Sequence, residues 1–240
     1  MLVDAHVHVK GGDRYRREFR PELILRCMDE AGVDKSCIFS MCLPSRASNR
    51  LTMDCYRSAP DRFIPFAHAV PKEGRGAVDE LRRCLDEDGA RGLKLHRGEM
   101  CEPWFDPLPP ILEVCVESQC PVLFDFGLNL ELARQIAESF PELKLIIAHL
   151  GAPADEDLNE LFIVLAESAP NVWLDTSYVS SPWMIPEAIE RLGPERVIFG
   201  SDGPLIHPSI ELAKIAVCGL SEADCRKVTG ENILNLLRPV

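Results

Sequence analysis

Short segments rich in β-forming residues alternate with longer helical patterns along the whole chain, and this alternation limits the fold more than any other feature of the sequence. Repeated strand–helix units are typical of a parallel sheet whose faces are covered by helices. The predicted strands are Leu2–Val9, Ser36–Cys42, Phe63–Val70, Gly92–His96, Val122–Phe126, Leu143–His149, Val172–Thr176 and Val197–Gly200. The predicted helices are Pro21–Ala31, Ser45–Ser58, Gly76–Glu87, Leu108–Ser118, Leu130–Phe140, Asp157–Ala169, Pro182–Leu192, Pro208–Val217 and Glu222–Leu237.

Eight strand–helix units follow one another with no low-complexity linker and no break in composition. Eight such units fit a closed barrel. The sequence therefore predicts an α/β fold, a single-domain (β/α)8 TIM barrel over residues 1–240. An open, doubly wound sheet is the alternative, but the glycine-rich phosphate loop of such folds is absent after the first predicted strand.

The composition excludes some classes of partner. The net charge is −12, which argues against nucleic acid or an anionic membrane, because both attract basic surfaces. The sequence has neither a signal-peptide pattern nor an apolar run long enough to span a bilayer, so we expect a cytoplasmic protein. Its ten cysteines, at positions 27, 37, 42, 55, 84, 101, 115, 120, 218 and 225, form no Cys-x-x-Cys pair, and we expect reduced thiols.

The histidines and several carboxylates fall at the C-terminal ends of the predicted strands, where the chemistry of such barrels is located. Five of the six histidines end strands and one follows the last strand: His6, His8, His68, His96, His149 and His207. The carboxylates in similar positions are Asp125, Asp175 and Asp202. Histidines without a shared role would be spread over the helices and the opposite rim as well. The clustering therefore predicts an active site at this rim.

His6 and His8 lie two residues apart in the first predicted strand, so their side chains point to one face while Ala5, Val7 and Val9 point to the other. Imidazoles about 7 Å apart on one strand face can bind the same metal ion. An isolated His-x-His pair is as often two ordinary histidines. The other residues of the rim make this pair the predicted first half of a metal site.

A divalent ion explains the cluster physically. Neutral imidazoles together with a carboxylate suit an ion such as zinc, which keeps an open position for water. The ion lowers the pKa of that water towards about 7. Asp202 follows the last strand and is placed to accept the proton and return it to a leaving group.

Five segments, in order along the chain, carry a resemblance to a known family. They are Asp4–His8, Gly92–His96, Ile147–Gly151, Phe199–Pro204 and Gly230–Leu234. As a set they resemble the amidohydrolase superfamily, specifically the amidohydrolase-related group of metal-dependent enzymes that includes aminocarboxymuconate-semialdehyde decarboxylase and pyrone-dicarboxylate lactonase. The resemblance covers nearly the whole chain.

The resemblance implies a role for each matching residue. His6 and His8 would bind the metal, Asp202 would be a further ligand and a catalytic residue, and His149 would be a catalytic residue in contact with the metal-bound water or the substrate. The chain departs from the family on the fifth strand, where Asp125 stands in place of the usual histidine ligand. Asp125 is predicted to replace that histidine as a metal ligand. The alternative is a weakened or lost metal site.

Three basic residues at the end of the fourth strand are candidates for binding an anionic substrate: Lys94, His96 and Arg97. Lys94 is expected to pair with Asp125 or with a substrate carboxylate, rather than to become carboxylated and bridge two metal ions as in some amidohydrolases. Arg97 has the planar fork that binds carboxylates, although an exposed salt bridge is the commoner fate of such an arginine.

Other residues of the rim have an ordinary structural role as a competing interpretation. His68 can be a hydrogen-bonded strand-end histidine, His207 a helix cap, and Asp175 an acceptor for loop backbone. Trp104 and Trp183 either wall a pocket or pack over the barrel mouth.

These features predict a metal-dependent hydrolase that uses metal-activated water to cleave a C–N or C–O bond of a small anionic amide, lactone or ester. Zinc is the expected ion and manganese the alternative. Two other functions stay open: a non-oxidative decarboxylase on the same scaffold, and a barrel that has lost catalysis and only binds a ligand. The expected partner is a small molecule, with no nucleic acid and no membrane. A homodimer is an open alternative to a monomer.

Overall fold

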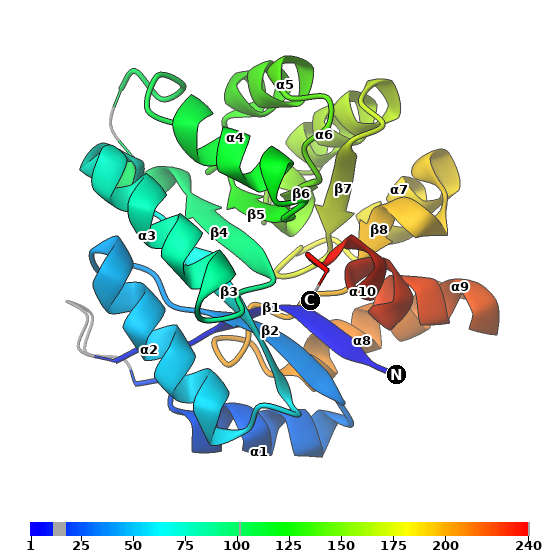
Figure 1. Ribbon diagram of the computed structural model, residues 1–240. Helices are drawn as coiled ribbons and strands as arrows, with labels where there is room; N and C mark the ends of the chain where they lie inside the picture. Colours follow the sequence, from blue (N-terminus) through cyan, green and yellow to red (C-terminus); the bar gives the residue numbers. More distant parts are fainter. Residues whose placement is uncertain (12–17, 101, 240) are drawn as a thin grey trace.

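Eight parallel strands form one sheet in which each strand pairs with the next along the sequence (Figure 1). The computed structural model describes residues 1–11, 18–100 and 102–239. The strands are β1 Val3–His8, β2 Lys35–Phe39, β3 Phe63–His68, β4 Gly92–His96, β5 Val122–Asp125, β6 Leu145–Ile147, β7 Val172–Asp175 and β8 Val197–Ile198. Hydrogen bonds join β1 to the segment after β8, from Ala5 N to Phe199 O (3.1 Å) and from His8 N to Gly203 O (2.7 Å). The barrel is therefore nearly closed, and the predicted single-domain (β/α)8 TIM barrel is confirmed.

Helices cover the outside of the barrel and connect its strands (Figure 1). They are α1 Pro21–Ala31, α2 Ser45–Ser58, α3 Arg75–Asp86, α4 Pro109–Glu117, α5 Leu130–Ser139, α6 Glu156–Ser168, α7 Met184–Leu192, α8 Pro208–Val217, α9 Glu222–Arg226 and α10 Asn232–Leu236. Short 3-10 turns are η1 Pro71–Glu73, η2 Arg97–Glu99, η3 Ala148–Gly151 and η4 Pro194–Arg196, and η5 Lys227–Glu231 is a π turn.

Some predicted elements are shorter or divided. The sixth strand ends at Ile147 because His149 and Leu150 adopt left-handed backbone conformations, with φ of 61° and 47°. The eighth strand ends at Ile198, since the next amide, Phe199 N, donates to Val228 O (2.8 Å). The predicted helix Glu222–Leu237 is interrupted by the π turn η5, so it forms α9 and α10.

An irregularity in β1 changes which of its residues share a face. The pairing of β1 with β2 shifts register between Asp4 and Val7. Ala5 packs in a cluster with residues of β2, β3 and β5, whereas Val7 and Val9 pack against α1. The prediction that Ala5 and Val7 share a face is therefore wrong, because the irregularity interrupts the alternation. His6 and His8 nevertheless line the same pocket.

Two apolar regions hold the barrel together. Buried residues of β1, β2, β3, β5, β6 and β8 meet in one cluster, and Ile233 and Leu236 of α10 pack against it. Residues from strands on opposite sides of a barrel can meet only in its interior, so this cluster fills the inside of the barrel. Because α10 packs against the cluster, it covers one end of the barrel, and the other end is open for the active site. The larger region lies between the strands and the surrounding helices, with Phe162 and Leu174 among its fully buried members.

Six of the cysteines are buried free thiols: Cys27, Cys37, Cys55, Cys84, Cys115 and Cys120. Cys101 lies outside the described residues. None of the helices in the described ranges combines the length and apolar character that crossing a bilayer requires. The cytoplasmic location and the homodimer stay predictions.

Replacing Gly92 by alanine is expected to lower the free energy of unfolding by about 1–3 kcal/mol, the usual cost of overpacking a core. A Cβ at Gly92 would lie 2.4 Å from the ring of Phe66, which is buried. Gly76→Ala is the control, because its Cβ in α3 would meet nothing within 4 Å. We expect the control to stabilise the protein by about 0.5 kcal/mol. Urea unfolding measures both, and a Gly92→Ala protein as stable as the wild type would contradict the packing described.

Candidate active site

Three side chains at the open end of the barrel form a group suited to a metal ion. His6 and His8 of β1 and Asp202, which follows β8, each offer one ligand atom, and these atoms lie within 4.8 Å of one another. The Nε2 atoms of His6 and His8 lie 3.5 and 2.7 Å from Oδ1 of Asp202. All three residues are buried. Two imidazoles and one carboxylate suit zinc or manganese and leave coordination positions open for substrate.

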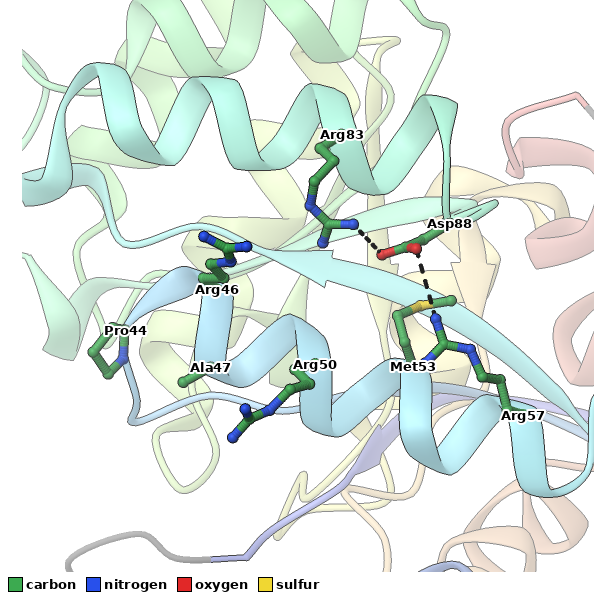
Figure 2. Close-up of a pocket in the computed structure, with 8 residues that line it drawn as sticks. All are labelled: Pro44, Arg46, Ala47, Arg50, Met53, Arg57, Arg83 and Asp88. Carbon is green, nitrogen blue, oxygen red and sulfur yellow. Dashed lines mark hydrogen bonds and ion pairs between the residues drawn. The ribbon is translucent and has the colours of Figure 1, made fainter.

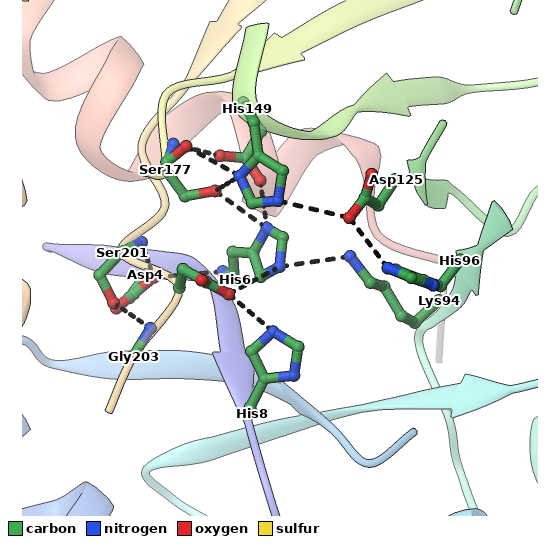
Figure 3. A network of polar contacts seen from close by, with 12 residues as sticks. Asp4, His6, His8, Lys94, His96, Asp125, His149, Ser177, Ser201 and Gly203 are labelled. Carbon is green, nitrogen blue, oxygen red and sulfur yellow. Dashed lines mark hydrogen bonds and ion pairs between the residues drawn. The ribbon is translucent and has the colours of Figure 1, made fainter. Parts of the chain in front are cut away.

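A carboxylate behind His6 fixes the orientation of its ring (Figure 3). Nδ1 of His6 lies 2.6 Å from Oδ2 of Asp175, at the end of β7. With the proton on Nδ1, the lone pair of Nε2 is directed towards Asp202, as is usual for metal-binding histidines. Burial, followed by the charge of Lys94, lowers the pKa of His6 to about 4, and burial also lowers the pKa of His8. Both rings are therefore neutral at pH 7, as ligands must be.

A second buried carboxylate, Asp4, ties β1 to the loop that carries Asp202. It accepts hydrogen bonds from Ser201 N (2.9 Å), Ser201 Oγ (2.5 Å) and His6 N (3.1 Å). Asp202 itself has a left-handed backbone, with φ of 59°. A residue other than glycine adopts this conformation only when its surroundings hold it there. The bonds of Asp4 supply that constraint at the metal group.

Lys94 enters the site from β4 and is buried. Its Nζ lies 3.2 Å from Nε2 of His6 and 4.9 Å from the centre of the Phe39 ring (Figure 3). Burial lowers the pKa of the ammonium, and the nearby carboxylates, Asp125 first among them, only partly oppose this. Lys94 is thus a buried basic group next to the metal group, and its role in binding substrate stays a prediction.

Asp125 contacts histidines outside the metal group. Its Oδ2 lies 3.2 Å from Nε2 of His96 and 3.7 Å from Nε2 of His149 (Figure 3). Burial disfavours the charged carboxylate, but the two histidines and Lys94 outweigh burial and hold its pKa well below the usual range. Burial likewise opposes the charged form of His149, yet Asp125 outweighs it and the pKa of His149 is raised. Its other oxygen, Oδ1, accepts a hydrogen bond from Gly127 N (2.8 Å), and a role of Asp125 as metal ligand stays a prediction.

Ser177, after β7, links the two halves of the site. Its Oγ lies 3.1 Å from Nδ1 of His6 and 3.0 Å from Nδ1 of His149, and its carbonyl oxygen accepts from Nδ1 of His149 (2.9 Å). Asp175 in turn accepts from Ser177 N (2.5 Å). Asp175 therefore holds the loop backbone, as one interpretation predicted, and also orients His6.

These residues surround a pocket of about 210 Å³, which can hold a small molecule. The pocket is lined by His6, His8, Lys10, Met41, Lys94, His96, Asp125, His149, Pro153, Tyr178, Asp202 and Leu205. Every predicted catalytic and metal-binding residue is in this set, as are the predicted substrate-binding residues Lys94 and His96. Lys10 and Tyr178 also line the pocket, although the sequence did not indicate them as site residues. Ser177 and Ser201 do not line it, but they hydrogen-bond to residues of the site.

The other residues considered in the sequence do not line this pocket. The guanidinium of Arg97 stacks on Trp104, 5.0 Å from the ring centre, and Arg97 does not line the pocket. His68 is buried, with Nε2 3.1 Å from Glu99 and Nδ1 3.1 Å from Lys94 O. His207 caps α8 by accepting from Ser209 N (3.3 Å), so the helix-cap interpretation is confirmed. Trp183 is 69% exposed.

Replacing Asp175 by asparagine is expected to weaken metal binding by about 10–100-fold, the usual effect of losing the carboxylate behind a metal-binding histidine. The amide can still accept from His6 Nδ1, so the ring keeps a partner but loses the negative charge. Competition with a chelator measures the dissociation constants of zinc and manganese. Asp29→Asn is the control, since Asp29 only pairs with Arg62 on the surface. Equal constants in the two variants would show that Asp175 does not support the metal group.

Comparisons with known proteins agree with this arrangement. A family model described as Amidohydrolase matches residues 3–238. The crystal structure of 5-carboxyvanillate decarboxylase from Sphingomonas paucimobilis has a TM-score of 0.78 at 17% identity, with 100% of this chain and 99% of that chain covered. A dihydroxybenzoic acid decarboxylase from a Polaromonas species, with bound manganese and the inhibitor 2-nitroresorcinol, gives 0.78 at 18%, with 98% and 96% covered. The structure of 4-oxalomesaconate hydratase from Rhodopseudomonas palustris has a TM-score of 0.71 at 18% identity, with 98% of this chain and 95% of that chain covered.

The structural likenesses are all below 25% identity, so they support the barrel fold. The family model, in contrast, spans nearly the whole sequence and includes His6, His8, His149 and Asp202. The motifs that carry the resemblance in the sequence lie within the same range. The chain therefore belongs to the amidohydrolase family.

Proposed function

We propose that this protein is a metal-dependent, non-oxidative decarboxylase of a small aromatic or unsaturated carboxylic acid. The observation that carries the proposal is the pairing, in one pocket of about 210 Å³, of the metal group His6, His8 and Asp202 with the basic residues Lys10, Lys94 and His96. A small anion fits such a pocket because its charge is met from two sides. The proposal ranks decarboxylation above the hydrolysis predicted from the sequence.

A divalent ion held by His6, His8 and Asp202 would supply positive charge that orients a substrate carboxylate and stabilises electrons released from its C–C bond. Lys94 would bind the same anion from the β4 side, since its Nζ lies 3.2 Å from His6 Nε2. Burial of both groups excludes water and strengthens their interaction with a charged substrate.

His149 is the proposed proton donor. Its Nδ1 is held by Ser177 O at 2.9 Å, which directs Nε2 into the pocket beside Asp125. The substrate C–C bond breaks, carbon dioxide leaves, and the electron pair left on carbon takes the proton from His149. Asp125 favours the charged form of His149, because it raises the pKa of the ring. The ring regains its proton from solvent through the open end of the pocket.

The names of the related structures support decarboxylation over hydrolysis. Two of the relatives described above are decarboxylases of aromatic acids, and one of these holds manganese. Hydrolysis by metal-activated water is the second candidate, because the hydratase among the relatives adds water to its substrate on the same fold. Zinc, expected from the sequence, and manganese, present in a relative, are both proposed as the resident ion.

Activity of protein purified without chelator and loaded separately with zinc and with manganese tests the proposal. We expect 2,6-dihydroxybenzoate or 5-carboxyvanillate to release carbon dioxide, and lactones and amides to give no turnover. Turnover of lactones or amides alone would reverse the order of the two functions. Absence of both activities, together with failure to take up either ion, would favour the barrel that only binds a ligand.

A further inference from the structure

A groove on the outside of the barrel, between α2 and α3, is rich in arginine (Figure 2). It has a volume of about 570 Å³ and is lined by Arg46, Arg50 and Arg57 of α2, by Arg83 of α3 and by Asp88. Four arginines and one aspartate give this lining a net charge of +3, which Asp54 and Glu80, paired with Arg57 and Arg83 beside the groove, reduce to +1. The whole chain, in contrast, has a net charge of −12. A local excess of positive charge on an acidic protein is typical of a site for anions.

Two of the four arginines are fixed by carboxylates. Nη1 of Arg83 lies 2.7 Å from Oδ2 of Asp88, and Nη2 of Arg57 lies 3.7 Å from Oδ1 of the same residue (Figure 2). Arg83 also donates two hydrogen bonds to Glu80, at 2.8 and 3.0 Å. These contacts close one end of the groove and hold its guanidinium groups in place.

Glu80, which holds Arg83, is itself connected to the barrel by hydrogen bonds. Glu80 accepts a hydrogen bond from Asn49 Nδ2 (3.3 Å), and Asn49 accepts from His68 N (2.7 Å) and donates to His68 O (3.1 Å). Glu80 and Asn49 are buried. This chain of hydrogen bonds joins α3 through α2 to β3, so the position of Arg83 is set before any ligand arrives. Preorganisation of this kind lowers the cost of binding.

The other two arginines have no such partner. Arg46 and Arg50 are exposed, lie one helical turn apart on α2, and make no ion pair or hydrogen bond within residues 1–11, 18–100 and 102–239. Arg46 projects over the space between the two helices, on the side of Arg83 (Figure 2). Neither guanidinium is held by a carboxylate within the described part of the chain, so both are available to a ligand.

We propose that this groove binds a small phosphorylated ligand, with Arg46 and Arg50 as its flexible contacts and with Arg83, whose guanidinium is held by Glu80 and Asp88, as a fixed positive charge beside them. The guanidinium fork matches phosphate oxygens in a bidentate way, and several arginines around one volume are the usual means of holding a doubly charged group. The volume lies within the range of small-molecule sites. The groove is separate from the metal pocket, whose lining shares no residue with it. The proposal is therefore independent of the proposed reaction.

Titration of the full-length protein with inorganic phosphate, followed by ³¹P NMR, tests the site. We expect saturable binding to the wild type. The double variant Arg46→Gln with Arg50→Gln should raise the dissociation constant at least about tenfold, because charge-assisted hydrogen bonds are lost. The matched control, Arg75→Gln with Arg82→Gln, also removes two exposed positive charges, but from α3 outside the groove. It should leave the constant within about twofold, which separates the groove from the general charge of the surface.

Circular dichroism and thermal melting establish that both double variants are folded, which glutamine at exposed helical positions permits. If the groove variant melts early, its two single variants replace it in the comparison. Equal dissociation constants in the groove variant and the control would overturn the proposal. Lack of saturable phosphate binding by the wild type would overturn it as well.

Discussion

Replacing His8 by alanine is expected to reduce bound metal from about one ion per chain to a small fraction, and to lower turnover at least about 10³-fold. His8 offers one of the three ligand atoms, and its Nε2 lies 2.7 Å from Oδ1 of Asp202. Metal analysis of protein purified without chelator measures the loss directly. Because this readout does not depend on the substrate, it tests the metal group before the reaction is known.

His8→Ala is a sharper variant than His6→Ala. The ring of His6 binds the buried carboxylate of Asp175, so removing it leaves an unpaired charge that costs stability. His207→Asn is the matched control, since asparagine can also cap α8 and His207 lies outside the pocket. We expect the control to keep its metal. Retention of the ion by His8→Ala would place the ion elsewhere and contradict the metal group described.

The arrangement of the fold could be predicted from local patterns, because each strand and helix carries its own periodicity. The barrel brings the ends of all eight strands together, so polar residues such as His6, His149 and Asp202 could be assigned to one rim without coordinates. The ends of the strands are predicted less accurately. The sequence predicts that the sixth strand ends at His149, whereas the backbone of His149 is left-handed and its Nδ1 contacts the carbonyl oxygen of Ser177, 28 residues away.

The hydrogen-bond partners of the site residues could not be predicted, because they lie far away in the sequence. Asp175 and His6 are 169 residues apart, and Ser177 and His6 are 171 apart. Residue types at strand ends indicate which side chains reach the rim, but not which atoms are within hydrogen-bonding distance. Arg97 illustrates the limit, because one residue after His96 the chain turns into η2 and the guanidinium stacks on Trp104 instead. Where such a side chain points depends on the exact residue at which the strand ends, and tertiary packing determines that residue.

Asp125 is the residue at which the chain departs from the family's sequence pattern, and its role as a metal ligand stays a prediction. Its Oδ2 contacts His96 and His149, and its Oδ1 accepts a hydrogen bond from Gly127 N (2.8 Å). Its position follows from the pairing of β4 with β5, which places His96 directly beside Asp125. The site thus contains two groups, one built on Asp202 and one on Asp125, and the Nζ of Lys94 is directed towards His6 of the first group (Figure 3).

Replacing Asp125 by asparagine is accordingly expected to lower turnover by about 10²–10⁴-fold, the range for loss of general acid catalysis, while metal content stays unchanged. The neutral amide can still contact both histidines, but it no longer holds His149 in its charged form. Asp155→Asn serves as the control, because asparagine preserves the N-cap that Asp155 gives to α6. Metal analysis and turnover measured on the same preparations separate the two roles. If metal is lost together with activity, Asp125 is the fourth ligand and replaces the family's histidine directly. If activity falls while the metal stays, this family member has converted its fifth-strand ligand into a residue that controls the proton on His149.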